Sequence, residues 1–120
     1  RLTYDLTPEH IVWDVGGFEG QWSSDIFAKY QPTIHIFEPV KEFADEIKTR
    51  FAHNPKIQVH QYGLSDHDAT EEISIAGDRA STFVQSKENE QALFRTTSTV
   101  LEELGTPTLI KLNIEGGEYP

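Results

Sequence analysis

Short apolar runs alternate, in the first half of the chain, with longer segments that have apolar residues at every third or fourth position. Apolar runs occupy residues 11–15, 33–38 and 57–62, and each has the length of a strand. The segments between them, residues 21–30 and 40–51, have the spacing of helices that bury one face. Strands and helices that alternate in this way are typical of βαβ units, in which the strands run parallel.

The pattern changes in the second half of the chain. Short alternating pieces at residues 71–76 and 81–85 predict a β-hairpin or a similar excursion from the main sheet. Residues 86–91 are polar, and residues 99–102 predict the start of a short helix with a capping box. A last apolar run at residues 108–114 predicts a fourth buried strand.

These elements predict an α/β fold with a Rossmann-like, doubly wound and mostly parallel sheet, in one domain of residues 1–120. The parallel strands are expected in the order third, second, first, fourth. The fourth strand then forms an apolar edge, and the chain reaches Pro120 where the next helix should begin. We therefore expect a chain truncated after its fourth strand, and a homo-oligomer that pairs through the exposed sheet edge.

Residues 10–20, HIVWDVGGFEG, join the first strand to closely spaced glycines. Such glycines let the chain turn sharply and let a ligand approach the backbone. A dinucleotide fingerprint ending at Gly20 would need a glycine where the chain has Val15, so NAD is disfavoured. Asp14 stands two residues before the first glycine, and a carboxylate there repels a pyrophosphate and attracts an ammonium group. This combination suits the methionine end of S-adenosylmethionine.

Glu38 ends the second strand, 24 residues after Asp14. Doubly wound folds present an acidic residue to a ribose at an interval of about 20 residues, and a carboxylate accepts hydrogen bonds from both ribose hydroxyls. Each feature also has an alternative interpretation without a ligand. Glu38 could simply cap or solvate the end of the strand, and the glycine turn could be a tight strand-to-helix connection.

Composition narrows the classes of partner. Ten Lys and Arg stand against 20 Asp and Glu, which gives a net charge of −10, whereas nucleic-acid binding draws on clustered basic residues. The chain has no cysteine, so it has neither a disulfide framework nor a thiolate zinc site. No apolar run approaches the ~18 residues that span a bilayer, and the first residues have no signal-peptide core. We expect no nucleic-acid or membrane partner and a cytoplasmic location.

Five short segments occur in the order of a known family. The chain resembles the FkbM-type S-adenosylmethionine-dependent methyltransferases, whose segments are roughly DVGAN-x-G, FEP, A-L-S-D and IKIDVEGAE. The matching segments are DVGGFEG, IFEP, YGLSD, STF and LIKLNIEGGE, between residues 14 and 118. The resemblance implies the class I methyltransferase fold and methyl transfer to a hydroxyl of a sugar or small metabolite. Phe18 stands where the family often has Asn, and Asn113 where it usually has Asp.

The resemblance also implies a set of cofactor-binding residues. The turn around the methionine part contains Asp14, Gly16, Gly17, Phe18 and Gly20, and Glu38 and Pro39 lie on the ribose and adenosine side. The remaining members are Leu64, Ser65, Asp66 and Asn113. The segment from Leu64 to Asp66 flanks the adenine in this picture, unless it is an ordinary strand-end turn, and Asn113 faces the methyl-transfer region.

The catalytic residues are less clearly marked. Methyl transfer to a hydroxyl needs a group that removes its proton, and Glu115, Asp66 and the histidines are the alternatives. Asn113 and Glu115 are the candidate catalytic residues. Together with Glu118 they offer oxygen ligands for a hard cation, but Asn113 is neutral and Glu118 suits a helix start, so we expect no metal.

Two functions therefore remain. The first is a methyltransferase that uses S-adenosyl-L-methionine and a small-molecule or saccharide acceptor. The second is a catalytically silent module that binds an adenosine ligand and serves an interaction or regulatory role, which the replacement of an expected Asp by Asn113 favours.

Overall fold

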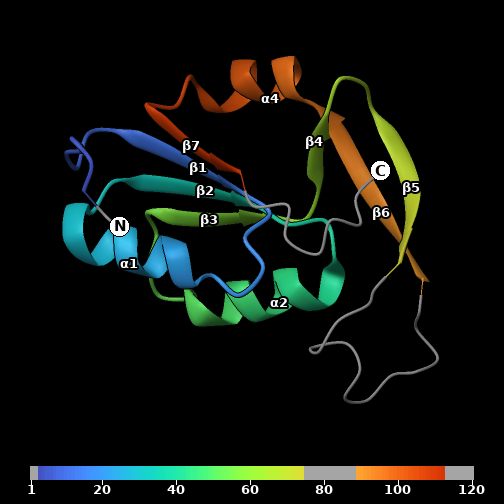
Figure 1. Ribbon diagram of the computed structural model, residues 1–120, viewed down its shortest axis with the longest axis horizontal. Helices are drawn as coiled ribbons and strands as arrows, with labels where there is room; N and C mark the ends of the chain where they lie inside the picture. The colour runs from blue at the N-terminus through green and yellow to red at the C-terminus, as the bar shows by residue number, and fades with distance from the viewer. Residues whose placement is uncertain (1–2, 75–88, 113–120) are drawn as a thin grey trace.

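Four parallel strands form the central sheet of the protein (Figure 1). The computed structural model describes residues 3–74 and 89–112. The strand order is β3-β2-β1-β7, which confirms the expected order. The strands are β1 (Ile11–Val15), β2 (Thr33–Phe37), β3 (Ile57–His60) and β7 (Leu109–Leu112).

Helices cover both faces of this sheet, which makes the fold α/β and consistent with a Rossmann-like arrangement (Figure 1). Helices α1 (Gln21–Tyr30) and α2 (Lys41–Arg50) lie on one face, and α4 (Thr97–Leu104) lies on the other. The predicted bounds of the first strand and first helix are confirmed, and those of the second strand and second helix hold to within a residue at each end. None of the helices in the described part of the chain is long and apolar enough to cross a membrane.

Alternate residues of the central strands pack into two separate cores. Val12, Ile34 and Ile36 pack with residues of the two helices on the first face. Trp13 and Phe37 pack with residues of α4 on the opposite face. Because both faces of β1 and β2 are buried, their sequences are nearly continuous apolar runs rather than alternating ones.

A second, three-stranded sheet lies beyond the carboxyl ends of the parallel strands (Figure 1). It consists of β4 (Gly63–Ser65), β6 (Asn89–Thr96) and β5 (Ala69–Ser74), in the order β4-β6-β5. Ala92 and Phe94 of the middle strand are buried and pack with the first residues of α2. This packing places the second sheet beside the ends of β1 and β2.

Two parts of this region differ from what their sequence suggests. Residues 89–91 are polar but belong to β6, because β6 pairs residue by residue with β5. Leu64 and Ser65 were expected in a turn after the third strand but lie in β4, because they pair in parallel with the end of β6. An antiparallel pair does form here, but the expected partner, residues 81–85, lies outside the described residues.

The start of α4 also differs from its prediction. The helix begins at Thr97 rather than Thr99, and its N-cap, Thr96, makes no side-chain capping bond. Instead, the amide and hydroxyl of Thr96 both donate to Asp68 Oδ1, at 2.7 and 2.8 Å. The predicted capping box with Glu102 is therefore wrong, because a carboxylate distant in sequence fixes the helix start.

Strand β7 forms the outer edge of the described sheet. Among the described residues it pairs with β1 on one side. Ile110 and Leu112 remain 48% and 68% exposed. Pairing of this edge with a second copy stays a prediction.

The buried His35 and the partly buried His60 form a pair on the face that carries α4. Their Nδ1 and Nε2 atoms lie 3.0 Å apart, and the His60 ring stacks on Phe37 at 5.1 Å. Burial, above all, lowers the pKa of His60 to about 4. The charged groups that act on this ring are His35, Arg95 and Lys48, which lower its pKa, and Glu103, which raises it.

We expect the protein to lose stability on acidification through this pair. Because the pKa of His60 is 6.5 in the unfolded chain and about 4 in the folded one, the unfolded chain binds more protons between these values. The free energy of unfolding should therefore fall as the pH is lowered from 6.5 towards 4. Chemical denaturation across this range should show a smaller fall for His60→Phe, which keeps the stacking on Phe37. An equal fall in both proteins would contradict the assignment.

Candidate functional site

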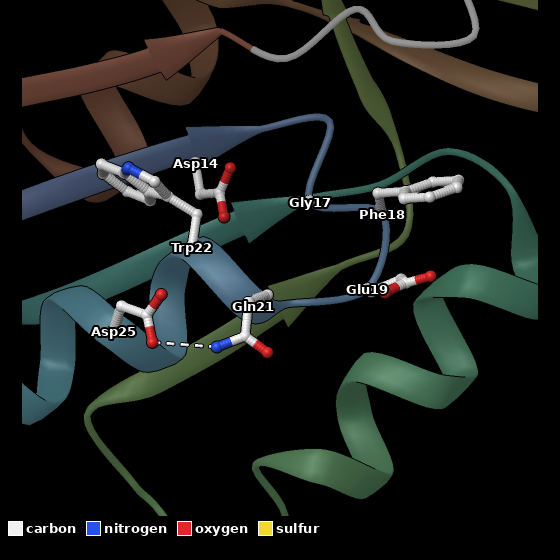
Figure 2. A pocket seen from close by; sticks show the side chains of 7 residues that line it. All are labelled: Asp14, Gly17, Phe18, Glu19, Gln21, Trp22 and Asp25. Carbon is white, nitrogen blue, oxygen red and sulfur yellow. Dashed lines mark hydrogen bonds between the residues drawn. The ribbon is translucent and has the colours of Figure 1, made fainter. Parts of the chain in front are cut away.

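A cavity of about 330 Å³ lies beside the turn between β1 and α1. Figure 2 shows Asp14, Gln21, Trp22 and Asp25 around the first turn of α1, whereas the side chains of Phe18 and Glu19 extend away from Asp14. Strand β1 lies between β2 and β7, so its carboxyl end is the point where the strand order reverses. Open α/β sheets bind ligands at this point. The residues that line the cavity are Asp14, Gly17, Phe18, Glu19, Gln21, Trp22 and Asp25.

The backbone of the turn passes three times through the left-handed region. The φ angles are 82° at Gly16, 55° at Phe18 and 84° at Gly20. The amides of Gly16 and Gly17 donate to the carbonyl oxygen of Phe37, at 2.8 and 3.4 Å, and the Gly20 amide donates to Gly17 O at 2.9 Å. These three amides therefore form hydrogen bonds within the protein. In a phosphate-binding loop, by contrast, such amides point at the ligand.

Asp14 is a buried carboxyl group at the edge of this cavity. It is 1% exposed, and the Ser23 hydroxyl donates to its Oδ2 at 2.7 Å. Burial raises the pKa of Asp14, while the Ser23 hydrogen bond and the charge of Lys111 act in the opposite direction. Lys111 is the register neighbour of Asp14 on β7. The site therefore contains one buried carboxyl group, with a lysine beside it on the adjacent strand.

The cavity lining is acidic. It includes the carboxylates of Asp14, Glu19 and Asp25, and the described lining has no Lys or Arg. The amide of Gln21 donates to Asp25 Oδ1 at 2.9 Å, and the Trp22 ring supplies an aromatic surface. The three carboxylates favour a cationic group over a diphosphate, although Lys111 lies 5.6 Å over the Trp22 ring and Arg50 donates to the Gln21 side chain.

Glu38, at the end of β2, is fully buried. Its Oε1 accepts a hydrogen bond from the Phe18 amide at 2.9 Å, and its Oε2 accepts one from the Val40 amide at 3.1 Å. Glu38 therefore ties the glycine turn to the residues that begin α2. The expected contact with a ribose stays a prediction.

The expected adenine-flanking residues lie apart from the cavity lining. Leu64 packs in the core beneath α4, and the backbone oxygen of Ser65 accepts a hydrogen bond from the Thr97 hydroxyl at 3.1 Å. The Asp66 side chain is exposed and lies 2.6 Å from the His67 ring nitrogen. Their role toward adenine stays a prediction. The positions of Leu64 and Ser65 in β4, and of the exposed Asp66 after it, fit an ordinary strand end equally well.

Pro39 is buried between Glu38 and α2. Asn113 and Glu115, the candidate catalytic residues, and Glu118 lie outside the described residues. Within residues 3–74 and 89–112, no group of three or more His, Asp or Glu side chains is placed to hold a metal ion.

Three residues of the cavity lining, and Ser23, which bonds to Asp14 behind it, were not singled out by the sequence. Trp22 lies on the apolar helical face and was expected to serve the core, while Ser23, Gln21 and Asp25 carried no motif. Their common signal is position, because all four occupy the first five residues of the helix that follows the glycine turn. Lys111 had no such signal, because it is brought beside Asp14 only by the pairing of β7 with β1.

No protein-family model matches this chain, and no curated protein matches it either.

We expect Gly17 to be indispensable for packing the turn onto the sheet. A Cβ atom at this position would lie 2.3 Å from Ile36 Cγ2 and 3.2 Å from Ile47 Cδ1. Gly17→Ala should therefore lower the free energy of unfolding by about 1–3 kcal/mol through overpacking. Chemical denaturation measures this effect, with Glu102→Ala on the exposed side of α4 as the control. Equal stability of Gly17→Ala and the wild type would show that the turn has room for a side chain.

Proposed function

We propose that this chain is the cofactor-binding domain of a class I methyltransferase that uses S-adenosylmethionine in the cytoplasm. The acceptor is a hydroxyl of a sugar or small metabolite, as in the FkbM-type family that the sequence resembles. The observation that carries the proposal is the buried Asp14 at the end of the central strand, on an acidic cavity beside the glycine turn.

The charge of the site supports this cofactor over a dinucleotide. S-adenosylmethionine has an ammonium group and a sulfonium, whereas NAD has a pyrophosphate. Asp14, Glu19 and Asp25 attract the first and repel the second. The internal bonds of Gly16 and Gly17 also leave those amides engaged rather than directed at a phosphate.

The strand order supports separate contacts of two residues with the two parts of the cofactor, the ammonium group and the ribose. Strands β1 and β2 are parallel neighbours, so Asp14 and Glu38 come from adjacent carboxyl ends. Asp14 would hold the ammonium group, and Glu38 would serve the ribose at the next strand end. Trp22 and Gln21 would bound the space beside the methionine part.

The cofactor supplies an electrophilic methyl group on its sulfonium. The residues described here bind and orient the cofactor and limit the access of water to Asp14. Removal of the acceptor proton requires a base. Glu115, one of the alternatives for this base, follows β7, whose carboxyl end adjoins that of β1.

We expect Asp14 to control cofactor affinity. Asp14→Asn keeps the shape of the side chain but removes its charge, so it should weaken binding of S-adenosylhomocysteine by about 1.5–3 kcal/mol. Wild-type affinity should also fall as the pH is lowered towards the raised pKa of Asp14, because protonation removes the same charge. Isothermal titration calorimetry at several pH values measures both effects.

The matched control is Glu102→Gln, because Glu102 is exposed on α4, which lies on the face of the sheet opposite α1. It should bind like the wild type. Absence of S-adenosylhomocysteine binding to the wild-type protein would refute the proposed cofactor, and equal affinities of the wild type and Asp14→Asn would refute the role of Asp14.

The catalytically silent module predicts the same binding but no turnover. Asn113, where the family usually has Asp, is the sequence feature that favours it. Transfer of a labelled methyl group from S-adenosylmethionine to a panel of hydroxyl acceptors separates the two functions. We expect transfer to at least one acceptor, and binding without transfer to any of them would favour the silent module.

A further inference from the structure

Glu38 occupies an unusual position for a ligand-binding carboxylate, because the fold itself uses both of its oxygens. One oxygen accepts from the Phe18 amide and the other from the Val40 amide. The side chain is 0% exposed. Its contacts thus serve the turn on one side and the start of α2 on the other.

The two amide bonds do not by themselves prevent a ribose from binding here, because a carboxylate has about four lone-pair sites. Access is the constraint, because Glu38 is fully buried and, unlike Asp14, does not line the cavity. A group that covers Glu38 must therefore move before a ribose can reach it.

Phe18 is the group placed to move. Its φ of 55° lies in the left-handed region, which is strained for a residue that carries a side chain. The Glu38 bond to its amide offsets this strain, as does the edge-to-face contact of its ring with Phe43, at 4.8 Å between centroids. Phe18 also lines the cavity, so a ligand that enters there lies next to it.

We propose that Glu38 is a positioning residue that holds the glycine turn through the Phe18 amide, and that ribose hydroxyls displace this amide when a nucleoside binds. In the free protein, Glu38 keeps Phe18 in its left-handed conformation and so shapes the cavity. In the complex, the ribose takes over the oxygen that the amide has left. The displacement step rests on the proposed function, whereas the positioning step concerns the free protein alone.

Amide hydrogen exchange measured by NMR tests the positioning step. Glu38→Met keeps the length of the side chain but removes both acceptors, so exchange at Phe18 and Val40 should accelerate about tenfold or more. The Ile34 amide, which bonds to Lys56 O within the parallel sheet, reports any global loss of stability and serves as the internal reference. Glu102→Met, on the exposed side of α4, is the matched control and should leave both amides protected.

Two nucleosides test the displacement step in the wild-type protein. Adenosine has both ribose hydroxyls, whereas 2′,3′-dideoxyadenosine has neither. Adenosine at saturation should accelerate exchange at Phe18 and leave Val40 protected. The dideoxy compound should bind more weakly by about tenfold or more, because it lacks the hydrogen bonds to the carboxylate, and should leave Phe18 protected.

Each result has a separate meaning. Unchanged exchange at Phe18 in Glu38→Met, relative to Ile34, would overturn the positioning role. Bound adenosine with Phe18 still protected would overturn the displacement. If the wild type binds neither adenosine nor S-adenosylhomocysteine, the proposed function and the displacement are both refuted. The exchange data on Glu38→Met would still decide the positioning role.

Discussion

The turn after β1 depends on hydrogen bonds from three consecutive backbone amides to the end of β2. The amides of Gly16 and Gly17 donate to the Phe37 carbonyl, and that of Phe18 donates to the Glu38 carboxylate. Because β1 and β2 are parallel neighbours, these bonds fix the turn relative to the sheet. The position of the turn then fixes the first residue of α1, and thus the residues that surround the cavity.

This arrangement places two buried carboxyl groups at one end of the sheet, which is costly unless each has hydrogen-bond partners. Asp14 has the Ser23 hydroxyl and the nearby charge of Lys111. Glu38 has two backbone amides. Buried groups of this kind add little to stability, because apolar residues of the same size fill such positions without a desolvation cost.

The first half of the fold could be predicted because its signals are local. Each strand from residue 11 to residue 60 is a short apolar run, and each helix repeats its apolar positions within one turn. The second half could not be predicted in the same way. Residues 89–91 are polar and become a strand only because β5 lies beside them, and α4 starts at Thr97 only because Asp68 binds Thr96. Pairing between distant segments overrides local composition here.

The sequence by itself determined the order of the parallel strands, the glycine turn and the acidic residues that end β1 and β2, because spacing along the chain sets which residues reach the strand ends. The tertiary structure decided what those residues touch. It engaged both oxygens of Glu38 with backbone amides, brought Lys111 beside Asp14, and placed Leu64 in the core rather than on the cavity. Burial and hydrogen-bond partners arise from contacts between segments that are far apart in sequence, so no local pattern contains them.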